Sequence, residues 1–150
     1  MASPILKRLQ RLFTRSHVFI YRISSGKIGG SLDGPPLLLL TTTGRKTGKP
    51  RTTPVAFIHK DGEYLIAASS AGSAQNPTWF SNLESNLEAT IEVKGKQIKV
   101  KPVITSGDER HKLYELFKTT YPSFIWVQER TTREIPVVRL QAVIPNSDKS

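Results

Sequence analysis

The stretch TTTGRKTGKPR, Thr41 to Arg51, is the part of this 150-residue chain whose residue types and spacing are most suited to chemistry. It contains Arg45, Lys46 and Lys49 besides Arg51, with two glycines, one proline and no acidic residue. Glycine permits tight turns that point backbone N–H groups at one spot, and cations around such a turn can bind an anion. Three charge-assisted hydrogen bonds to a phosphate or carboxylate would contribute roughly 5–9 kcal/mol. The stretch therefore predicts an anion-binding loop, although a solvated basic turn is the plainer interpretation.

Two familiar phosphate-binding motifs do not fit this loop. A Walker A motif has G-x-x-x-x-G-K-[ST], whereas Gly44 and Gly48 stand only four positions apart and Pro50 occupies the hydroxyl position. The G-x-G-x-x-G fingerprint of dinucleotide-binding folds does not occur either. The loop is therefore a candidate for an anion of another kind.

The composition favours anionic partners and excludes several kinds of site. The formal net charge is +10, which suits phosphate, polycarboxylate, nucleic acid or an acidic membrane surface. The chain has no cysteine, so a disulfide, a thiolate nucleophile and a zinc–thiolate site are excluded. The three histidines, at positions 17, 59 and 111, are scattered, and we expect no metal site. The length suits one globular domain.

Residues 1–30 are predicted to form a basic amphipathic helix and a linker. No Asp or Glu occurs in residues 1–32, and Pro4 after Ser3 suits a helix start. At about 100° per residue the apolar side chains gather on one face and the basic ones on the other. The apolar set is Ile5, Leu6, Leu9, Leu12, Phe13, Phe19 and Ile20, and the basic set is Lys7, Arg8, Arg11, Arg15 and Arg22.

This helix could pack on the domain, lie in a membrane interface through residues 1–25, or act as an organellar transit peptide. No stretch has the roughly 18 consecutive apolar residues that a membrane span requires. We expect a cytoplasmic protein, and peripheral contact with the inner face of the cell membrane is a hypothesis.

Residues 31–145 predict a barrel domain, and residues 146–150 a polar tail. Lys60-Asp61-Gly62 and Lys94-Gly95 are hairpin turns. Asn76, Ser106 with Glu109, and Ser123 are expected helix caps. Strands are expected at 37–43, 55–59, 63–69, 89–93, 96–103 and 136–143, and helices at 77–86, 106–119 and 123–130. This order suggests a mostly antiparallel sheet that curls into a small barrel.

Three segments resemble the deazaflavin-dependent nitroreductase and quinone reductase family, whose members use the reduced deazaflavin cofactor F-420. They are LLLLTTTGRKTGKPRTTPV, LIAASSAGSAQNPTWFSNLESN and TTYPSF, and the resemblance runs from about Gly29 to Leu140. It implies an α+β, mainly β fold: a split β-barrel of the FMN-binding-like type, preceded here by the amphipathic helix. It also implies an oxidoreductase that takes hydride from F-420.

The resemblance carries a set of site residues with it. The basic loop would grip the phosphate and oligoglutamate tail of the cofactor, and the following strand would run beside it. The implied cofactor-binding residues are Lys46, Thr47, Arg51, Thr52, Thr53, Pro54, Val55, Ala56, Ala67, Ala68, Ser69, Ser70, Thr78, Trp79, Phe80, Ser81, Asn82 and Phe124. Tyr121 and Ser69 are the implied catalytic residues, and the Tyr121 hydroxyl would hydrogen-bond the acceptor or donate a proton.

The acceptor is expected to be hydrophobic, with a menaquinone-type quinone favoured. A nitroimidazole-activating family member has tyrosines where Phe124 and Val127 stand, so this chain implies a more apolar pocket. FMN is the second choice of cofactor, and a reductase of another small molecule or a haem-type binder remains open. A nucleic-acid-binding barrel is disfavoured because Phe57 and Tyr64 are the only aromatic residues in the expected strands.

Overall fold

Six antiparallel strands close into a barrel in the computed structural model, which describes residues 35–144. Around the barrel the strands are β1 (Leu37–Thr43), β2 (Pro50–Lys60), β3 (Glu63–Ala67), β6 (Val137–Ala142), β5 (Lys96–Ile104) and β4 (Ala89–Val93). β1 pairs with β2 on one side and with β4 on the other, which completes the ring. The predicted antiparallel barrel is thus confirmed. The helix predicted for residues 1–30 and the tail at 146–150 lie outside the described residues.

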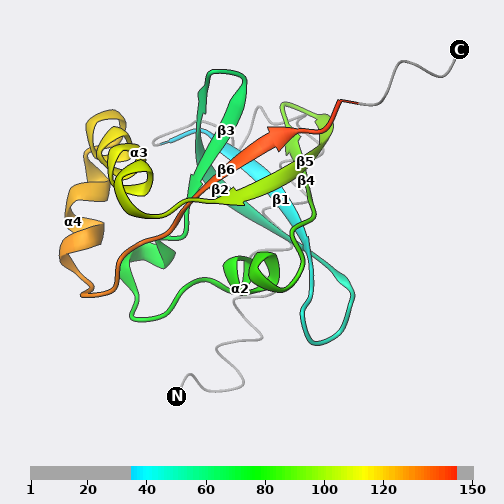
Figure 1. Cartoon of the computed structure of the whole chain (residues 1–150), viewed down its shortest axis with the longest axis horizontal. Helices are drawn as coiled ribbons and strands as arrows, with labels where there is room; N and C mark the ends of the chain where they lie inside the picture. Colours follow the sequence, from blue (N-terminus) through cyan, green and yellow to red (C-terminus); the bar gives the residue numbers. More distant parts are fainter. Residues whose placement is uncertain (1–34, 145–150) are drawn as a thin grey trace, which may run out of the picture.

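The helices are α2 (Thr78–Ser85), α3 (Gly107–Thr120) and α4 (Ser123–Glu129), with a 3₁₀ turn, η1, at Ser70–Gly72. Figure 1 shows α3 and α4 together on one flank of the barrel and α2 at one end, near the long connection between β1 and β2. Among residues 35–144, no helix is both long and apolar enough to cross a bilayer.

Two apolar cores hold these layers together. Side chains alternate along each strand, so Leu38 and Leu40 of β1 point into the barrel, where Ile66, Ile91 and other buried residues meet them. A second cluster joins the outer face of β3 and β6 to α3 and α4. Its fully buried members include Tyr114, Phe117, Ile135 and Val137. The Tyr114 hydroxyl also donates a hydrogen bond to the Phe124 carbonyl at 2.8 Å, which ties α3 to the start of α4.

Several predicted boundaries were wrong. β2 begins at Pro50 rather than Val55, because it pairs with the whole of β1, from Thr43 opposite Pro50 onward. A proline is tolerated there because the first residue of a strand can lack a ladder donor. β3 ends at Ala67 rather than Ser69, because Ser69 already has helical φ and ψ of −79° and −38°, and Ser70 follows with a positive φ of 45°.

The expected helix caps were also wrong in detail. Pro77, not Asn76, is the N-cap of α2, and Ser106 caps α3 without a side-chain hydrogen bond, so the capping box with Glu109 does not form. Ser123 is the first residue of α4 rather than its cap. The Asn76 side chain instead accepts a hydrogen bond from another part of the chain. Tertiary contacts override the local preference at this position.

Candidate active site

The basic loop between β1 and β2 is closed by its own backbone. Gly44 N–H donates to the Lys49 carbonyl at 2.8 Å, and Gly48 N–H donates to the Gly44 carbonyl at 2.7 Å. Gly48 has φ +70°, which favours glycine, and a Cβ on Gly44 would lie 2.8 Å from the Thr47 hydroxyl oxygen. Gly48 thus suits the left-handed position of the turn, and Gly44 leaves room for the Thr47 side chain and the Lys49 carbonyl.

The cationic side chains of this loop project into solvent. Arg45, Lys46, Lys49 and Arg51 are all exposed. None of them forms an ion pair with another residue between positions 35 and 144. Their charges are thus not compensated by acidic neighbours in the described part of the chain, and the loop can attract an anion.

Asn82 fastens this loop to α2. Its side chain is only 2% exposed. Nδ2 donates to the Thr42 hydroxyl at 3.1 Å, and Oδ1 accepts from the Arg45 backbone N–H at 3.1 Å. The end of β1, the first cation of the loop and α2 are consequently joined by one buried amide.

A cavity of about 280 Å³ lies beside the same strand. Its volume is near the lower end of the range for small-molecule pockets, which suits a single ring system. Small side chains and two aromatic rings dominate its wall. The described residues that line it are Thr53, Pro54, Val55, Ala56, Ala67, Ser69, Ser70, Ala71, Pro77, Trp79 and Phe124.

The cavity and the basic loop are neighbours in the fold. Thr53 lines the cavity and Arg51 stands two residues earlier on β2, which corresponds to about 7 Å along a strand. α2 makes the second link, because Trp79 lines the cavity and Asn82 binds the loop. A ligand with a flat ring and an anionic extension could therefore occupy both at once.

One wall of the cavity is a strained turn. Ser70 and Ala71 have φ of 45° and 54°, and Gly72 follows with 79°. The left-handed region costs a residue with a Cβ about 1–2 kcal/mol, so two such residues need support from their surroundings. Gly72 is packed tightly, since a Cβ there would lie 2.8 Å from the Val127 carbonyl of α4.

The structure gathers some of the predicted residues around the cavity and leaves others elsewhere. Ala68 and Phe80 are buried in the barrel core, and Thr52 shares a hydrogen bond of 2.8 Å with the Thr41 hydroxyl. The predicted residues that do not line the cavity are Lys46, Thr47, Arg51, Thr52, Ala68, Thr78, Phe80, Ser81, Asn82 and Tyr121. Their contact with a cofactor stays a prediction. Two residues that line the cavity, Ala71 and Pro77, were not predicted from the sequence. The signal that could have found them is the pair Gly72 and Pro77, since both residue types are typical of turns.

The two predicted catalytic side chains have different surroundings. Ser69 lines the cavity. The Tyr121 hydroxyl donates to the Phe57 backbone carbonyl at 2.8 Å, and burial raises the pKa of this phenol above its ordinary value of 10.0. Tyr121 is therefore neutral at physiological pH and ties the α3–α4 corner to β2. Within residues 35–144, no group of three or more His, Asp or Glu side chains is arranged to hold a metal ion.

Comparison with known proteins assigns the family. The model of the F420H(2)-dependent quinone reductase family matches residues 13–142. The chain belongs to this family. It is 39% identical over 130 residues to an F420H(2)-dependent quinone reductase of Mycobacterium tuberculosis, which covers 84% of this chain and 87% of that one. The resemblance seen in the sequence is confirmed, and with it the assignment to a family of deazaflavin-dependent oxidoreductases.

Solved structures support the same assignment. An F420-H2 dependent reductase, FDR-A, is 31% identical with a TM-score of 0.65, and the match covers 71% of this chain and 94% of that one. The heme storage protein HutZ of Vibrio cholerae is similar with a TM-score of 0.56, covering 88% of this chain and 92% of that one. At 12% identity the second likeness concerns the fold alone, and it agrees with the expected split barrel.

Replacing Asn82 by alanine should loosen the basic loop. The change would leave the Thr42 hydroxyl and the Arg45 N–H without their partner, which costs about 1–3 kcal/mol of unfolding free energy. Hydrogen exchange of the amides in residues 44–49 should become faster, and chemical denaturation should give the stability loss. Asn86→Ala, at the end of the same helix, is the matched control. Equal exchange of the loop in the two variants would contradict this role.

Proposed function

We propose that this protein transfers hydride from reduced F-420 to a hydrophobic quinone of the menaquinone type. One observation carries the proposal beyond family membership: a cavity of about 280 Å³ and an exposed, uncompensated basic loop share strand β2. The cofactor has the same two parts, a flat ring and a trailing anionic chain.

The cavity suits the ring rather than the whole cofactor. It is too small for the ring, the phosphate and an oligoglutamate tail together, so the tail would extend over the surface toward the loop. There Lys46, Thr47 and Arg51 would bind its anionic groups through charge-assisted hydrogen bonds. Three such bonds, at about 1.5–3 kcal/mol each, rival the roughly 8 kcal/mol of a micromolar complex before association costs.

The wall of the cavity is suited to a planar ring. Ala56, Ala67, Ser69 and Ser70 have short side chains, which allows a ring to come close to the backbone. Trp79 and Phe124 add aromatic surface for offset or edge contacts. The bound deazaflavin supplies the hydride, so the protein needs no nucleophile of its own. Its residues have to hold the ring, orient the acceptor and exclude water.

The proposed acceptor follows from the apolar character of α4. Phe124 lines the cavity, and Val127 is buried beside it in the same cluster. Trp126, between them in the sequence, is 46% exposed. Apolar side chains thus occur on both the buried and the exposed side of α4. They favour an acceptor that has a ring and a hydrophobic tail over a polar nitro compound.

Removing two loop cations should weaken cofactor binding. For Lys46→Ala/Arg51→Ala, the dissociation constant of F-420 should rise about tenfold or more and depend less on salt, because the lost contacts are ionic. A spectroscopic titration over a range of salt concentrations gives both quantities. Lys60→Ala/Lys96→Ala removes the same charge at the opposite end of the barrel and should have little effect. The proposal fails if the two double variants weaken binding equally, or if the wild-type protein binds FMN more tightly than F-420.

Tyr121 is proposed to assist the acceptor when the hydroxyl leaves the Phe57 carbonyl, and Ser69 to contact the ring from the cavity wall. Tyr121→Phe should then lower kcat with a menaquinone analogue by about a hundredfold or more, the lower end of the range for loss of an acid–base group. It should cost only about 0.5–1.5 kcal/mol of stability, the value of one hydrogen bond. Tyr64→Phe is the control, because its hydroxyl bonds no other residue of the described barrel. An unchanged kcat in Tyr121→Phe would contradict the catalytic role and leave Tyr121 only its structural hydrogen bond to β2.

Residues 1–25 are proposed to bring the enzyme to an anionic membrane surface, where a lipophilic quinone resides. The proposal comes from the separated basic and apolar faces of the sequence, since each cation near an anionic leaflet contributes about 1 kcal/mol. Deleting residues 1–25 should reduce partitioning onto phosphatidylglycerol vesicles and leave F-420 binding in solution unchanged. Cosedimentation of both proteins with anionic and neutral vesicles measures this. Equal partitioning before and after the deletion would refute it.

A further inference from the structure

The guanidinium of Arg133 is hydrogen-bonded almost entirely to the segment that forms the strained wall of the cavity. Nε donates to the Ser73 carbonyl at 2.9 Å, and Nη2 donates to the Ser69 carbonyl at 2.8 Å. Nη1 donates to the Ala68 carbonyl at 3.1 Å and to Asn76 Oδ1 at 2.8 Å. One side chain thus binds residues 68, 69, 73 and 76, which enclose the three consecutive positive-φ residues.

All four acceptors are neutral, and no carboxylate within residues 35–144 pairs with Arg133. Burial lowers the pKa of the guanidinium, although the group remains charged at any physiological pH. An arginine placed in this way is not explained by an ion pair. Its planar set of donors matches the spread of carbonyls that a non-repetitive turn leaves unsatisfied.

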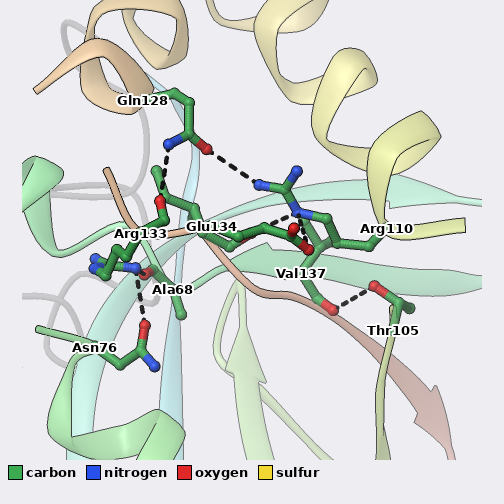
Figure 2. Close-up of polar contacts among 9 residues, drawn as sticks. Ala68, Asn76, Thr105, Arg110, Gln128, Arg133, Glu134 and Val137 are labelled. Carbon is green, nitrogen blue, oxygen red and sulfur yellow. Dashed lines mark hydrogen bonds and ion pairs between the residues drawn. The ribbon is translucent and has the colours of Figure 1, made fainter. Parts of the chain in front are cut away.

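The backbone of Arg133 is itself fixed by the helices on the flank of the barrel. Gln128 Nε2 donates to the Arg133 carbonyl at 2.9 Å, and Gln128 Oε1 accepts from Arg110 Nη2 at 3.2 Å. Arg110 is 8% exposed, and its Nε donates to the Ile135 carbonyl at 2.8 Å. Figure 2 shows this chain of contacts running from α3 through Gln128 to Arg133, with Ala68 and Asn76 at its far end.

We propose that Arg133 is the positioning residue of the cavity wall, holding residues 68–76 in the left-handed turn that presents Ser69, Ser70 and Ala71 to the ring. A turn with two non-glycine residues at positive φ persists only where its surroundings determine it. Arg133 does so by binding the carbonyls on both sides of the strained residues. The part of this inference that concerns the ring rests on the proposed function.

The test compares Arg133→Gln and Arg133→Lys with the wild-type protein. Glutamine keeps a polar side chain but is too short to reach all four acceptors, and lysine keeps the charge without the planar fork. Hydrogen exchange of residues 68–77 is measured without cofactor, and the dissociation constant of F-420 by titration. In Arg133→Gln the exchange of this segment and the dissociation constant should each rise about tenfold, with smaller rises in Arg133→Lys, while exchange of β1 and β5 stays unchanged.

Arg139→Gln is the matched control. Arg139, on β6, is another partly buried arginine. Unlike Arg133 it pairs with a carboxylate, because its Nη1 lies 3.0 Å from Glu63 Oε1. This variant should lose stability without faster exchange of residues 68–77 and without weaker binding of F-420. The control thereby separates a general loss of stability from a specific loosening of residues 68–77.

Two results would overturn the inference. Exchange of residues 68–77 at the wild-type rate in Arg133→Gln would mean that the turn does not depend on Arg133. A loosened turn with F-420 affinity within twofold of wild type would mean that the turn does not present the wall to the ring. If the wild-type protein fails to bind F-420, or Trp79→Ala binds it as well as wild type, the proposed function fails instead, and the exchange data still decide the positioning role.

Discussion

The pairing of β1 with two partners is the constraint on which the rest of the structure depends. β1 pairs with β2 along its whole length and with β4 from Leu39 to Thr42, so the barrel is closed and the leucines at positions 38–40 are buried. The same pairing sets the place of the basic loop. Because Thr43 is opposite Pro50, the residues between them cannot continue the ladder and must leave the sheet as a turn.

The proposed division of the ligand follows from a difference in environment along β2. At its start the strand is exposed and carries Arg51, whereas a few residues later it borders a cavity whose lining residues are all uncharged. An anionic chain gains from cations that remain in contact with water, because neither partner has to be fully desolvated. A flat ring gains from the opposite conditions, since enclosure removes its apolar surface from water. One strand supplies both conditions within a short distance.

Polar side chains that are buried or half-buried fix the loops around these two regions. Asn82 binds the basic loop from α2, Tyr121 binds β2 from the α3–α4 corner, and Arg133 binds the turn after β3. In each case a side chain satisfies backbone groups that no regular element satisfies. The barrel therefore provides a rigid frame, and a few long-range hydrogen bonds decide the shape of the site on it.

The sequence alone determined the elements and the family. Alternating and continuous apolar runs with glycine turns located all six strands, and the glycines with the cations of residues 44–51 marked the loop. These signals are local, because they depend on backbone propensity and on side chains a few residues apart. The same local reasoning placed the end of β3 and the cap at Asn76 wrongly, because it could not foresee that Arg133, some 60 residues away along the chain, binds the Ser69 carbonyl and the Asn76 side chain.

The family resemblance had named most of the residues that line the cavity, but only the tertiary structure decided that Ala71 and Pro77 line it too and which side chains bind its wall. Nothing near Arg133 in the sequence distinguishes it from the exposed Arg130, and Asn82 reads as an ordinary polar residue of a short helix. Their roles arise because the closed barrel brings them to unsatisfied carbonyls and amides on distant loops. Such contacts depend on how the chain is folded in space, whereas strand, turn and helix tendencies depend on the chain itself.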